Sequence, residues 1–574
     1  MKIETIEIIK FRSIKEGKIN FSTINALVGE NNSGKTGVLR ALNSVFNFKE
    51  EEEFFLNNAH QHAPRNNTRI IVTLSDIPNK SFYHGKTNGN QMTIIFTYTY
   101  SKNRRNLYYV VNGVEIATDE SFIKNLKQDI DYIYIHADRN SRDVTWNRGS
   151  IFSRLIDAYS AKYTQNKDFI SSKVKTTGDN FKNKVISGVN KQISELVSNN
   201  SISQITIDFI GKIDYSLFLD KLSIFIESDD SKYPITEYGS GIISLTAIAL
   251  YRAFGQLSNG NIILGIEEPE TNLHPQAQKE FISSLRRNMK DNEVQAIIST
   301  HSTVIVDSLQ HEDIILVRRE ANDKRGFIST ISQIDKSFWQ RHNLTPIKHY
   351  NFFKFRNSDF FFSKYVVIAE SSTDIQVFEK LIKDKIGNDI LNVSFLQLGG
   401  VTSAKYPYYL LSDLKIPFAL IVDKDFFTPY LNGELKNSRS METGLPLYKD
   451  TLDTTNELLY DIFDDSERNE IIRRISINYK SIFEFLKDYN IYTMNYCLEM
   501  DLSCSSQARS IYYELLNLEP DKQSQRELLV DNYKAIKKFE YILEIIQRIE
   551  SKSYPNSYKK ITKAISDDIQ KRIR

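Results

Sequence analysis

Short apolar runs alternate along the chain with segments whose apolar residues recur every three or four positions. Residues 24–28, 261–266 and 365–369 are mostly apolar runs of strand length, whereas residues 36–46 carry apolar side chains on one face at helical spacing. The first pattern is typical of strands buried on both faces, and the second is typical of helices that cover a sheet. The sequence therefore predicts an α/β fold.

Further strands are expected in the N-terminal part of the chain. Residues 2–9 alternate isoleucine with charged or polar residues, which is typical of an edge strand. Residues 107–116 predict a hairpin that turns at an Asn-Gly pair, and residues 131–136 predict another strand. The polar run 138–143 follows it. A solvated loop is favoured for this run over a segment that faces phosphates.

From residue 151 to about residue 197 the pattern becomes helical and highly charged. Apolar residues recur every three or four positions there, as in an amphipathic helix. We expect residues 151–230 to form a helical insertion that acts as an arm or dimerisation element. Its lysines fit either contacts to DNA or a solvated helix face, and spacing alone does not separate the two.

Composition limits the classes of protein that fit. The 574 residues are 41% hydrophobic and carry a net charge of +2, from 74 basic and 72 acidic residues, so a nucleic-acid surface would have to be a local patch. Two cysteines, Cys497 and Cys504, exclude a disulfide framework and a multi-cysteine metal site. Without an apolar leader or a run of membrane-spanning length, a cytoplasmic protein with no membrane association is expected.

One segment carries a phosphate-binding pattern. It matches G-x-x-x-x-G-K-S/T at every fixed position and lies between the strand 24–28 and the helix 36–46. Its residues are Gly29, Glu30, Asn31, Asn32, Ser33, Gly34, Lys35 and Thr36. Glycines let backbone N–H groups surround phosphate oxygens, and the helix N-terminus adds partial positive charge. Lys35 is expected to reach the terminal phosphates of ATP, and Thr36 to place its hydroxyl on Mg²⁺.

A second set of residues fits the same chemistry. A Gly-Ser-Gly turn that includes Ser240 and Gly241 opens a predicted helix, and the buried strand 261–266 ends in Glu267 and Glu268. Glu267 would hold Mg²⁺ through water, and Glu268 would orient and polarise the water that attacks the γ-phosphate. His301, at the end of the next predicted strand, would contact the γ-phosphate.

Up to about residue 330 the chain resembles an ABC-type ATPase head of SMC-like DNA-repair and anti-phage proteins. The phosphate loop stands at Walker A, Ser240 and Gly241 at the signature, Glu267 and Glu268 at Walker B, and His301 at the switch histidine. The resemblance implies that two heads enclose ATP, with each signature facing the phosphate loop of the other head.

The chain departs from the pattern of this family in two places. The signature is only Gly-Ser-Gly, and Glu267 replaces the usual aspartate of Walker B. The glutamine of the Q-loop is either Gln61 or Gln91. ATP could therefore control shape in this protein without rapid turnover.

A second α/β unit follows the ATPase-like part. Predicted strands at 365–369 and 417–422 end in Glu370 and in the pair Asp423 and Asp425. Parallel sheets place ligands at the carboxyl ends of their strands. A set of carboxylate oxygens suits Mg²⁺ or Mn²⁺.

This second part resembles a Toprim domain, with Glu370 at the glutamate of that family and Asp423 and Asp425 at its DxD motif. An ABC-type head followed by Toprim resembles the overcoming lysogenization defect (OLD) family, which includes the Gabija nuclease subunit and some retron effectors. Members carry further residues downstream, and the positions that fit them, or that can join the metal site, are Asp374, Glu499, Asp501 and Lys560, with Lys559 and Lys563 as rivals for the lysine.

Four segments follow from these assignments. We expect an N-terminal ATPase lobe at 1–150, the helical insertion at 151–230, the C-terminal part of the ATPase at 231–345, and a Toprim domain with helical insertions at 363–574.

The resemblance implies an ATP-regulated DNA endonuclease of anti-phage defence that uses two metal ions and a lysine. It also implies self-association as a dimer or tetramer. Some members of the family work with a helicase-like protein and others with a retron reverse transcriptase and its RNA–DNA, and the sequence does not choose between these two kinds of partner. Two alternatives remain open: an ATP-dependent DNA clamp with a non-cleaving Toprim domain, and a topoisomerase- or primase-like enzyme.

Overall fold

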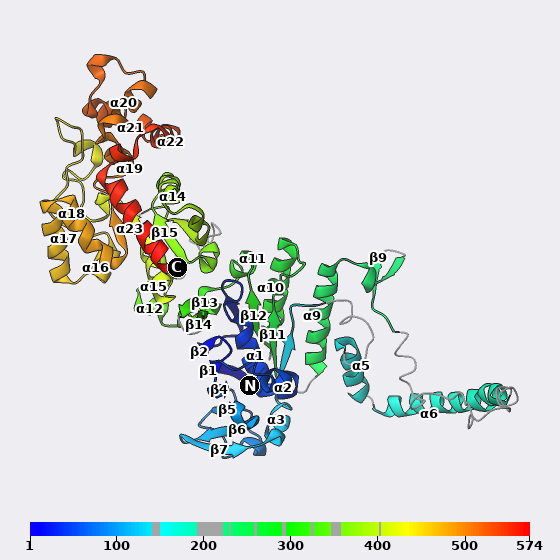
Figure 1. Cartoon of the computed structure of the whole chain (residues 1–574). Helices are drawn as coiled ribbons and strands as arrows, with labels where there is room; N and C mark the ends of the chain where they lie inside the picture. The colour runs from blue at the N-terminus through cyan, green and yellow to red at the C-terminus, as the bar shows by residue number, and fades with distance from the viewer. Residues whose placement is uncertain are drawn as a thin grey trace. The chain divides into compact units, whose positions relative to one another are not determined.

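The computed structural model divides the chain into two compact units, Met1–Ile331 and Ser332–Arg574 (Figure 1). It describes all residues except 140–149, 163, 192–221, 229–230, 258–260, 290–293, 323–325, 346–357, 401–402 and 574. Each unit has its own sheet and its own buried apolar core.

A twelve-stranded sheet, in the order β7-β6-β5-β4-β1-β2-β14-β13-β3-β12-β11-β8, forms the centre of the first unit. Its strands are β1 (Lys2–Phe11), β2 (Ile14–Asn20), β3 (Ile24–Val28), β4 (Thr68–Ser75), β5 (Gln91–Thr99), β6 (Arg104–Val111), β7 (Val114–Thr118), β8 (Ile130–Ile135), β11 (Asn261–Glu267), β12 (Val294–Thr300), β13 (Ile314–Asn322) and β14 (Gly326–Ser332). Strands β13, β3, β12, β11 and β8 pair in parallel, whereas β7, β6, β5, β4, β1 and β2 pair antiparallel. The predicted α/β class is confirmed.

The position of β1 corrects one expectation. This strand lies inside the sheet, between β4 and β2, and β7 and β8 form the edges. Ile3, Ile6 and Ile8 are fully buried, while the intervening polar side chains are only partly exposed. The alternation of isoleucine with polar residues in β1 therefore reflects the two faces of a strand inside an antiparallel sheet and not a position at its edge. The predicted hairpin is confirmed by β6 and β7, which pair antiparallel from Leu107 to Thr118.

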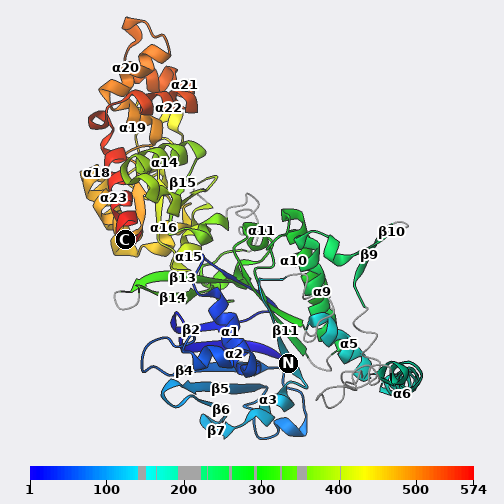
Figure 2. The ribbon, with the colours of Figure 1, turned by 45° about the vertical axis from the view of Figure 1, so that its right-hand side comes forward.

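Helices cover the parallel part of this sheet. They are α1 (Lys35–Phe46), α9 (Ser240–Leu257), α10 (Pro275–Met289) and the short α11 (Thr303–Val306). Helix α1 contacts β8, β11 and β12, and α9 contacts β8. Figure 2 shows α1 next to β11. Val38, Leu39 and Leu42 of α1 have no exposed surface, as the spacing of apolar residues predicts. The strand 24–28 and the helix after it lie where they were expected.

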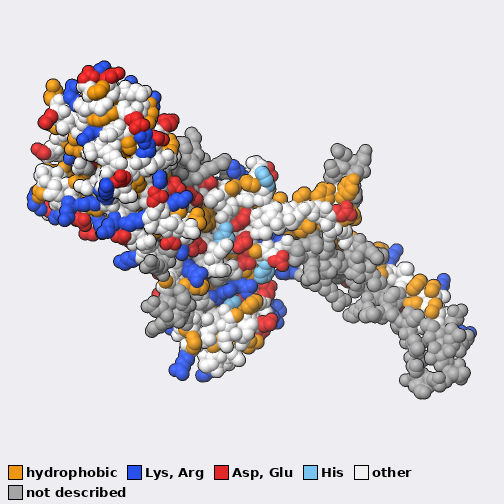
Figure 3. Space-filling model, turned by 45° about the horizontal axis from the view of Figure 1, so that its top comes forward, with side chains coloured by type: hydrophobic (Ala, Val, Ile, Leu, Met, Phe, Trp, Pro, Cys, Tyr) orange, Lys and Arg blue, Asp and Glu red, His pale blue; other side chains and the backbone are white. Residues whose placement is uncertain are grey.

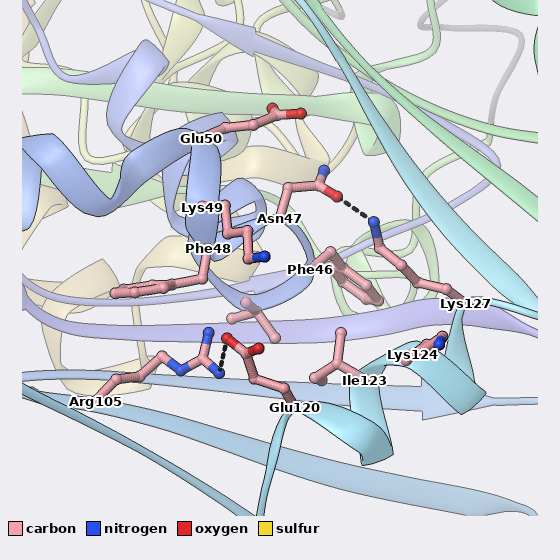
Figure 4. Close-up of a pocket in the computed structure, with 11 residues that line it drawn as sticks. Phe46, Asn47, Phe48, Lys49, Glu50, Arg105, Glu120, Ile123, Lys124 and Lys127 are labelled. Carbon is pink, nitrogen blue, oxygen red and sulfur yellow. Dashed lines mark hydrogen bonds and ion pairs between the residues drawn. The ribbon is translucent and has the colours of Figure 1, made fainter. Parts of the chain in front are cut away.

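The C-terminal end of α1 is fixed to the antiparallel part of the unit. A pocket of about 320 Å³ lies between α2 (Phe48–Leu56) and α3 (Glu120–Leu126), and Figure 4 shows the pairs that line it. Nη2 of Arg105 donates a hydrogen bond to Oε1 of Glu120 at 2.9 Å, and its guanidinium carbon lies 4.4 Å from the ring centre of Phe48. Nζ of Lys127 donates to Oδ1 of Asn47. These pairs fix the position of the helix that begins at the phosphate loop.

The insertion begins with helices, as predicted, in α5 (Ile151–Lys162) and α6 (Thr164–Phe181). A π-helical segment follows at Lys182–Ile186, and β9 (Phe225–Ser228) pairs with β10 (Ser231–Pro234) before α9. Helix α5 contacts α9. The rest of the predicted helical run, at 192–197, lies outside the described residues, as does the run 140–143.

The second unit is built on a parallel sheet in the order β16-β15-β17-β18. Its strands are β15 (Tyr365–Ala369), β16 (Val393–Gln397), β17 (Phe418–Val422) and β18 (Ile491–Thr493). Helices α14 (Ser372–Ile386) and α23 (Asn556–Ile573) contact each other and share one apolar core with the sheet. The sequence predicted β15 and β17, but the three residues of β18 are too few for a recognisable pattern.

The boundary between the units falls earlier than the predicted end of the ATPase part at 345. Helix α12 (Phe338–Arg341) packs in the second unit, against α15 (Lys405–Asp413). Trp339 stacks on Tyr406 with ring centroids 5.5 Å apart, and Arg341 bonds Asp413 at 2.5 Å. Residues 332–345 therefore begin the second unit.

The surface carries charges of both signs. Figure 3 shows acidic and basic side chains interspersed over the second unit, in keeping with the net charge of +2. Within the described part of the chain, no helix has both the length and the apolar character needed to cross a membrane.

Candidate functional site

The phosphate loop joins β3 to α1 and has the backbone that its glycines permit. Gly29 and Gly34 have φ of 151° and 112°, and Asn32 has φ of 60°. A Cβ on Gly29 would lie 2.0 Å from the carbonyl oxygen of Val317, and one on Gly34 would lie 2.3 Å from Oγ of Ser329. Only glycine fits both the φ angles and the space at these two positions.

Lys35 begins α1, and its side chain folds back along the loop. Its Nζ donates to the carbonyl oxygens of Gly29 at 3.0 Å and Glu30 at 2.8 Å. Burial lowers the pKa of Lys35 to about 8, against the opposing effect of Glu268 and Glu270. The loop therefore holds an ammonium group where carboxylates face it.

The carboxylates opposite Lys35, Glu268 and Glu270, follow β11, and His301 follows the neighbouring strand β12. Oε1 of Glu268 lies 3.6 Å from Nε2 of His301, and Oε1 of Glu270 accepts a hydrogen bond from the backbone N–H of His301 at 2.6 Å. Burial, and then Lys35, lower the pKa of His301 to about 4. The imidazole is therefore neutral at neutral pH and can donate or accept one hydrogen bond.

Glu267 and Glu268 point into different surroundings. Glu267 is buried, and its Oε2 accepts a hydrogen bond from the N–H of Ala137 at 3.3 Å. The side chain of Glu268, by contrast, is 44% exposed. The backbone of Glu268 is in the left-handed region, with φ of 40°. Such a backbone conformation is unfavourable for a residue with a Cβ and needs support from its neighbours.

Lys35, Glu268, Glu270 and His301 line one cavity of about 1120 Å³, whereas Glu267 is not among its lining residues. Of the residues predicted from the sequence, the cavity brings together Asn31, Asn32, Gly34, Lys35, Thr36, Glu268 and His301. Gln61 also lines it, whereas Gln91 lies on β5 and donates to Glu4 at 2.7 Å. The geometry thus favours Gln61 as the glutamine of the cavity. Arg12 and Arg319 line the cavity as well, although no sequence pattern singles them out.

Ser240 and Gly241 do not line this cavity. They begin α9, next to the segment that follows β11. A Cβ on Gly241 would lie 2.5 Å from the carbonyl oxygen of Asn272, so the two backbones touch. The signature-like turn thus contacts the segment of its own chain that follows Glu268.

A cluster of carboxylates lies in the second unit. Glu370 and Asp423 follow β15 and β17, and Asp425 lies two residues further on. Burial, and then Asp425 and Asp374, raise the pKa of Glu370 to about 7. The pKa of Asp423 is raised well above its usual range by burial and then by Asp374, Asp425, Glu499 and Glu370. The structure therefore places five of the predicted carboxylates near enough to one another to raise the pKa values of Glu370 and Asp423.

Lys537, which the sequence analysis did not name, is the lysine of this cluster. Its Nζ lies 3.2 Å from Oε1 of Glu499 and 4.5 Å from the ring centre of Tyr533. Burial lowers its pKa, but Glu499, Cys497 and Asp423 outweigh burial and raise it. Lys537 follows the four-residue helix α21 (Tyr533–Ile536) in a charged stretch, where no sequence pattern distinguishes it from its neighbours.

Lys560 lies elsewhere. Its Nζ is above the rings of Tyr479 and Phe483, at 5.4 and 5.5 Å, and the charged groups that act on it are Glu484 and Lys480. Of its rivals, Lys559 donates to the backbone of Lys552. Helix α23 therefore directs Lys560 toward α18 (Tyr479–Leu486), and the prediction that it belongs with the carboxylates is not supported.

Hydrogen bonds to neighbouring protein groups occupy both carboxylate oxygens of Asp501. Its two oxygens accept from the backbone N–H groups of Asn495 and Tyr496, both at 2.9 Å, and from the hydroxyl of Ser557 at 2.5 Å. Asp374 is also engaged, since its Oδ2 caps α14 by accepting from the N–H and hydroxyl of Ser371. Asp501 thus fixes the turn before Glu499, whereas Asp374 keeps a second oxygen for the cluster.

Replacing Asp501 by asparagine is expected to lower the free energy of unfolding by about 1–3 kcal/mol. The reason is that the new Nδ2 faces a backbone N–H whichever way the amide is turned. Thermal unfolding followed by circular dichroism measures the effect. Glu499→Gln, in the same helix turn, is the matched control and should change stability less. An unchanged melting temperature in Asp501→Asn would contradict an anchoring role.

The acidic cluster has the donor chemistry of a divalent-cation site. Oδ1 of Asp425 is buried without a hydrogen-bond partner, while its Oδ2 accepts from the hydroxyl of Tyr430 at 2.9 Å. Among the described residues, no three His, Cys, Asp or Glu side chains lie close enough together to ligate one ion. The carboxylates fit Mg²⁺ or Mn²⁺ by their donor chemistry, and Lys537 is a cation beside them.

Fold and geometry define a phosphate-loop ATPase joined to a Toprim-like α/β unit. Two family models match the chain: "AAA ATPase domain" at residues 1–93 and 74–306, and "Overcoming lysogenization defect protein-like, TOPRIM domain" at residues 361–425. The chain therefore belongs to the overcoming lysogenization defect family of ATPase–Toprim fusions.

Similar proteins include nucleases. The chain is 24% identical to the OLD nuclease of Thermus scotoductus over 74% of its own length and 82% of that protein. It is 24% identical to the Old nuclease of Escherichia phage P2 over 77% and 80% of the two chains, and 22% identical to Endonuclease GajA of Bacillus cereus strain HuB5-5 over 84% and 81%. A crystal structure of an SMC head bound to the C-terminal winged-helix domain of ScpA aligns at 15% identity and a TM-score of 0.40, covering 59% of this chain and all of that one.

Proposed function

We propose that this protein is an ATP-regulated, metal-dependent DNA endonuclease that acts in the cytoplasm in anti-phage defence. The observation that carries the proposal is the gathering of Glu370, Asp374, Asp423, Asp425 and Glu499 around Lys537, in a chain that also holds a complete phosphate loop. The nuclease names of the relatives support the same reaction class.

In the second unit, Glu370, Asp423 and Asp425, with Asp374 and Glu499, would hold two Mg²⁺ or Mn²⁺ ions. Such ions activate water and stabilise the leaving oxygen in phosphodiester hydrolysis. Lys537 would place a positive charge beside the scissile phosphate, where negative charge builds up. Asp501 would keep Glu499 in position through its bonds to Asn495 and Tyr496.

In the first unit, Lys35 and the loop N–H groups would bind the phosphates of ATP. Thr36 and Glu267 would hold its Mg²⁺, Glu268 would polarise the attacking water, and neutral His301 would contact the γ-phosphate. Ser240 and Gly241, which lie outside the cavity of their own head, would face the phosphate loop of a second copy. A dimer or tetramer follows from this arrangement.

Specificity would come from outside the acidic cluster, since carboxylates and metal ions contact only the DNA backbone. A helicase-like protein or a reverse transcriptase with its RNA–DNA would be the partner that presents DNA or releases inhibition. The ATPase head would couple the binding of ATP to the cleavage of DNA by the second unit.

One observation favours a second candidate, a topoisomerase-like reaction. The hydroxyl of Tyr430 donates to Asp425 at 2.9 Å, so a tyrosine lies beside the acidic cluster. Burial raises the pKa of Tyr430, which disfavours its ionised form. A tyrosine nucleophile would leave a covalent protein–DNA adduct, whereas hydrolysis would not.

The test is cleavage of plasmid DNA in Mg²⁺ or Mn²⁺ and in EDTA, with denatured samples examined for adducts. We expect metal-dependent cleavage without an adduct, and a loss of at least about 100-fold in Asp423→Ala. Asp384→Ala, which removes an exposed carboxylate of α14, is the control and should cleave normally. Cleavage that persists in Asp423→Ala would overturn the assignment, and an adduct lost in Tyr430→Phe would establish the second candidate.

A further inference from the structure

We infer that Arg139 is a positioning residue that ties the start of α9 to the backbone of Glu268. This arginine follows β8 in the polar run for which a solvated loop was favoured, but it is only 6% exposed. Because a buried guanidinium needs acceptors for its N–H groups, its partners indicate what it holds in place.

The partners of Arg139 lie on three elements. Nη1 donates to the carbonyl oxygens of His136 at 2.8 Å and Glu267 at 2.6 Å, and Nη2 donates to that of Glu268 at 2.6 Å. Nε donates to the hydroxyl of Ser244 at 2.7 Å. One side chain thus joins the ends of β8 and β11 to α9. A lysine, with a single nitrogen, does not reproduce this fork.

The bond to Glu268 falls where the backbone needs support. Glu268 has φ of 40°, and its carbonyl oxygen accepts from both Arg139 and the N–H of Thr271 at 3.0 Å, while its own N–H donates to Ser299 at 2.8 Å. These bonds hold an unfavourable conformation and aim the carboxylate into the cavity. Removing Arg139 would let the carboxylate move away from its working position.

The hydrogen bond from Arg139 to Ser244 connects the backbone of Glu268 to helix α9. Ser244 is 1% exposed and lies one turn after Ser240 and Gly241 on α9. Gly241 in turn touches the carbonyl oxygen of Asn272, in the segment that follows Glu268. Helix α9 therefore reaches Glu268 by two routes, one through Arg139 and one through Asn272. A shift of α9, such as engagement of its N-terminus by a second head, would be transmitted to the glutamate.

This inference rests on the proposed role of Glu268 in ATP hydrolysis, and it makes Arg139 necessary for turnover and not for nucleotide binding. We expect Arg139→Lys to lower kcat for ATP hydrolysis by about 100-fold, because small misplacements of a catalytic group have effects of this size. Ser244→Ala, which removes only the link to α9, should lower kcat by about fivefold, the effect of one hydrogen bond. In both variants KM and the Kd of a fluorescent ATP analogue should stay within about twofold of wild type.

The test measures kcat, KM and analogue binding for these variants and for two controls. Ser44→Ala removes a buried helical hydroxyl that bonds only within α1 and should leave kcat unchanged. Glu268→Gln tests the proposed function separately, and Ser244→Ala should have no further effect in that background. Unchanged kcat in both Arg139→Lys and Ser244→Ala, or parallel losses of kcat and analogue binding, would overturn the positioning role. Rapid hydrolysis by Glu268→Gln would instead refute the role of the glutamate.

Discussion

Replacement of Lys537 by alanine is expected to reduce the rate of DNA cleavage by about 100- to 1000-fold, the usual cost of removing one group that stabilises transition-state charge. Its Nζ lies 3.2 Å from Oε1 of Glu499, a member of the acidic cluster that also contains Glu370 and Asp423. Lys537 is therefore placed to neutralise charge on a bound phosphate. Single-turnover cleavage of a labelled duplex at saturating Mn²⁺ measures this loss.

The neighbouring lysines supply the controls for this prediction. Lys534→Ala removes a lysine from α21, the short helix that Lys537 follows, and Lys560→Ala removes the residue that the sequence had favoured. Both are expected to stay within about twofold of wild type, as for substitutions away from the reacting groups. Strong loss in Lys560→Ala together with normal cleavage by Lys537→Ala would show that Lys560 is the lysine of the site.

Replacement of Glu268 by glutamine should lower kcat for ATP hydrolysis by about 100- to 10,000-fold, the range for loss of a general base. Binding of ATP should persist, because the phosphate loop and Lys35 are unchanged. The side chain of Glu268 is partly exposed to the cavity and lies 3.6 Å from His301, whose low pKa keeps the imidazole neutral. Steady-state phosphate release and equilibrium binding of an ATP analogue measure the two effects.

The control for this variant is Glu280→Gln, on the exposed face of α10. It should hydrolyse ATP at the wild-type rate. If Glu268→Gln keeps more than about half of the wild-type rate, Glu268 is not the base, because removal of a general base cannot be that mild.

Much of this fold could be predicted because its main strands carry strong local patterns. The strands β3, β11, β15 and β17 are short apolar runs that end in glycine or carboxylate, and parallel sheets collect such ends at one edge. The phosphate loop was predictable for the same reason: its chemistry requires fixed residue types at fixed spacing.

Residues that act through tertiary contacts could not be found in this way. Lys537 reaches the carboxylates from the position just after a four-residue helix far along the chain, and nothing in its local sequence differs from that around Lys534 or Lys560. Arg139 lies in a run of charged residues that is typical of a solvated loop, yet its partners come from α9 and β11, more than 100 residues away. Only the folded structure brings these groups together.

Asp501 shows a second limit of sequence patterns. It is two residues from Glu499 in a stretch that suggests a pair of metal ligands, but its oxygens are bonded to Asn495, Tyr496 and Ser557. In a short helix such as α19 (Leu498–Ser503), residues two positions apart point in different directions. Adjacent carboxylates can therefore have different roles.

The central claim, that ATP in the first unit controls DNA cleavage in the second, is tested most directly by one measurement. It is the rate of DNA cleavage with and without ATP in wild-type protein and in Lys35→Ala. We predict that ATP changes the wild-type rate by about fivefold or more, the lower range of couplings between distinct sites, and leaves the rate of Lys35→Ala unchanged. Equal wild-type rates with and without ATP, or an equal response to ATP in both proteins, would contradict the account.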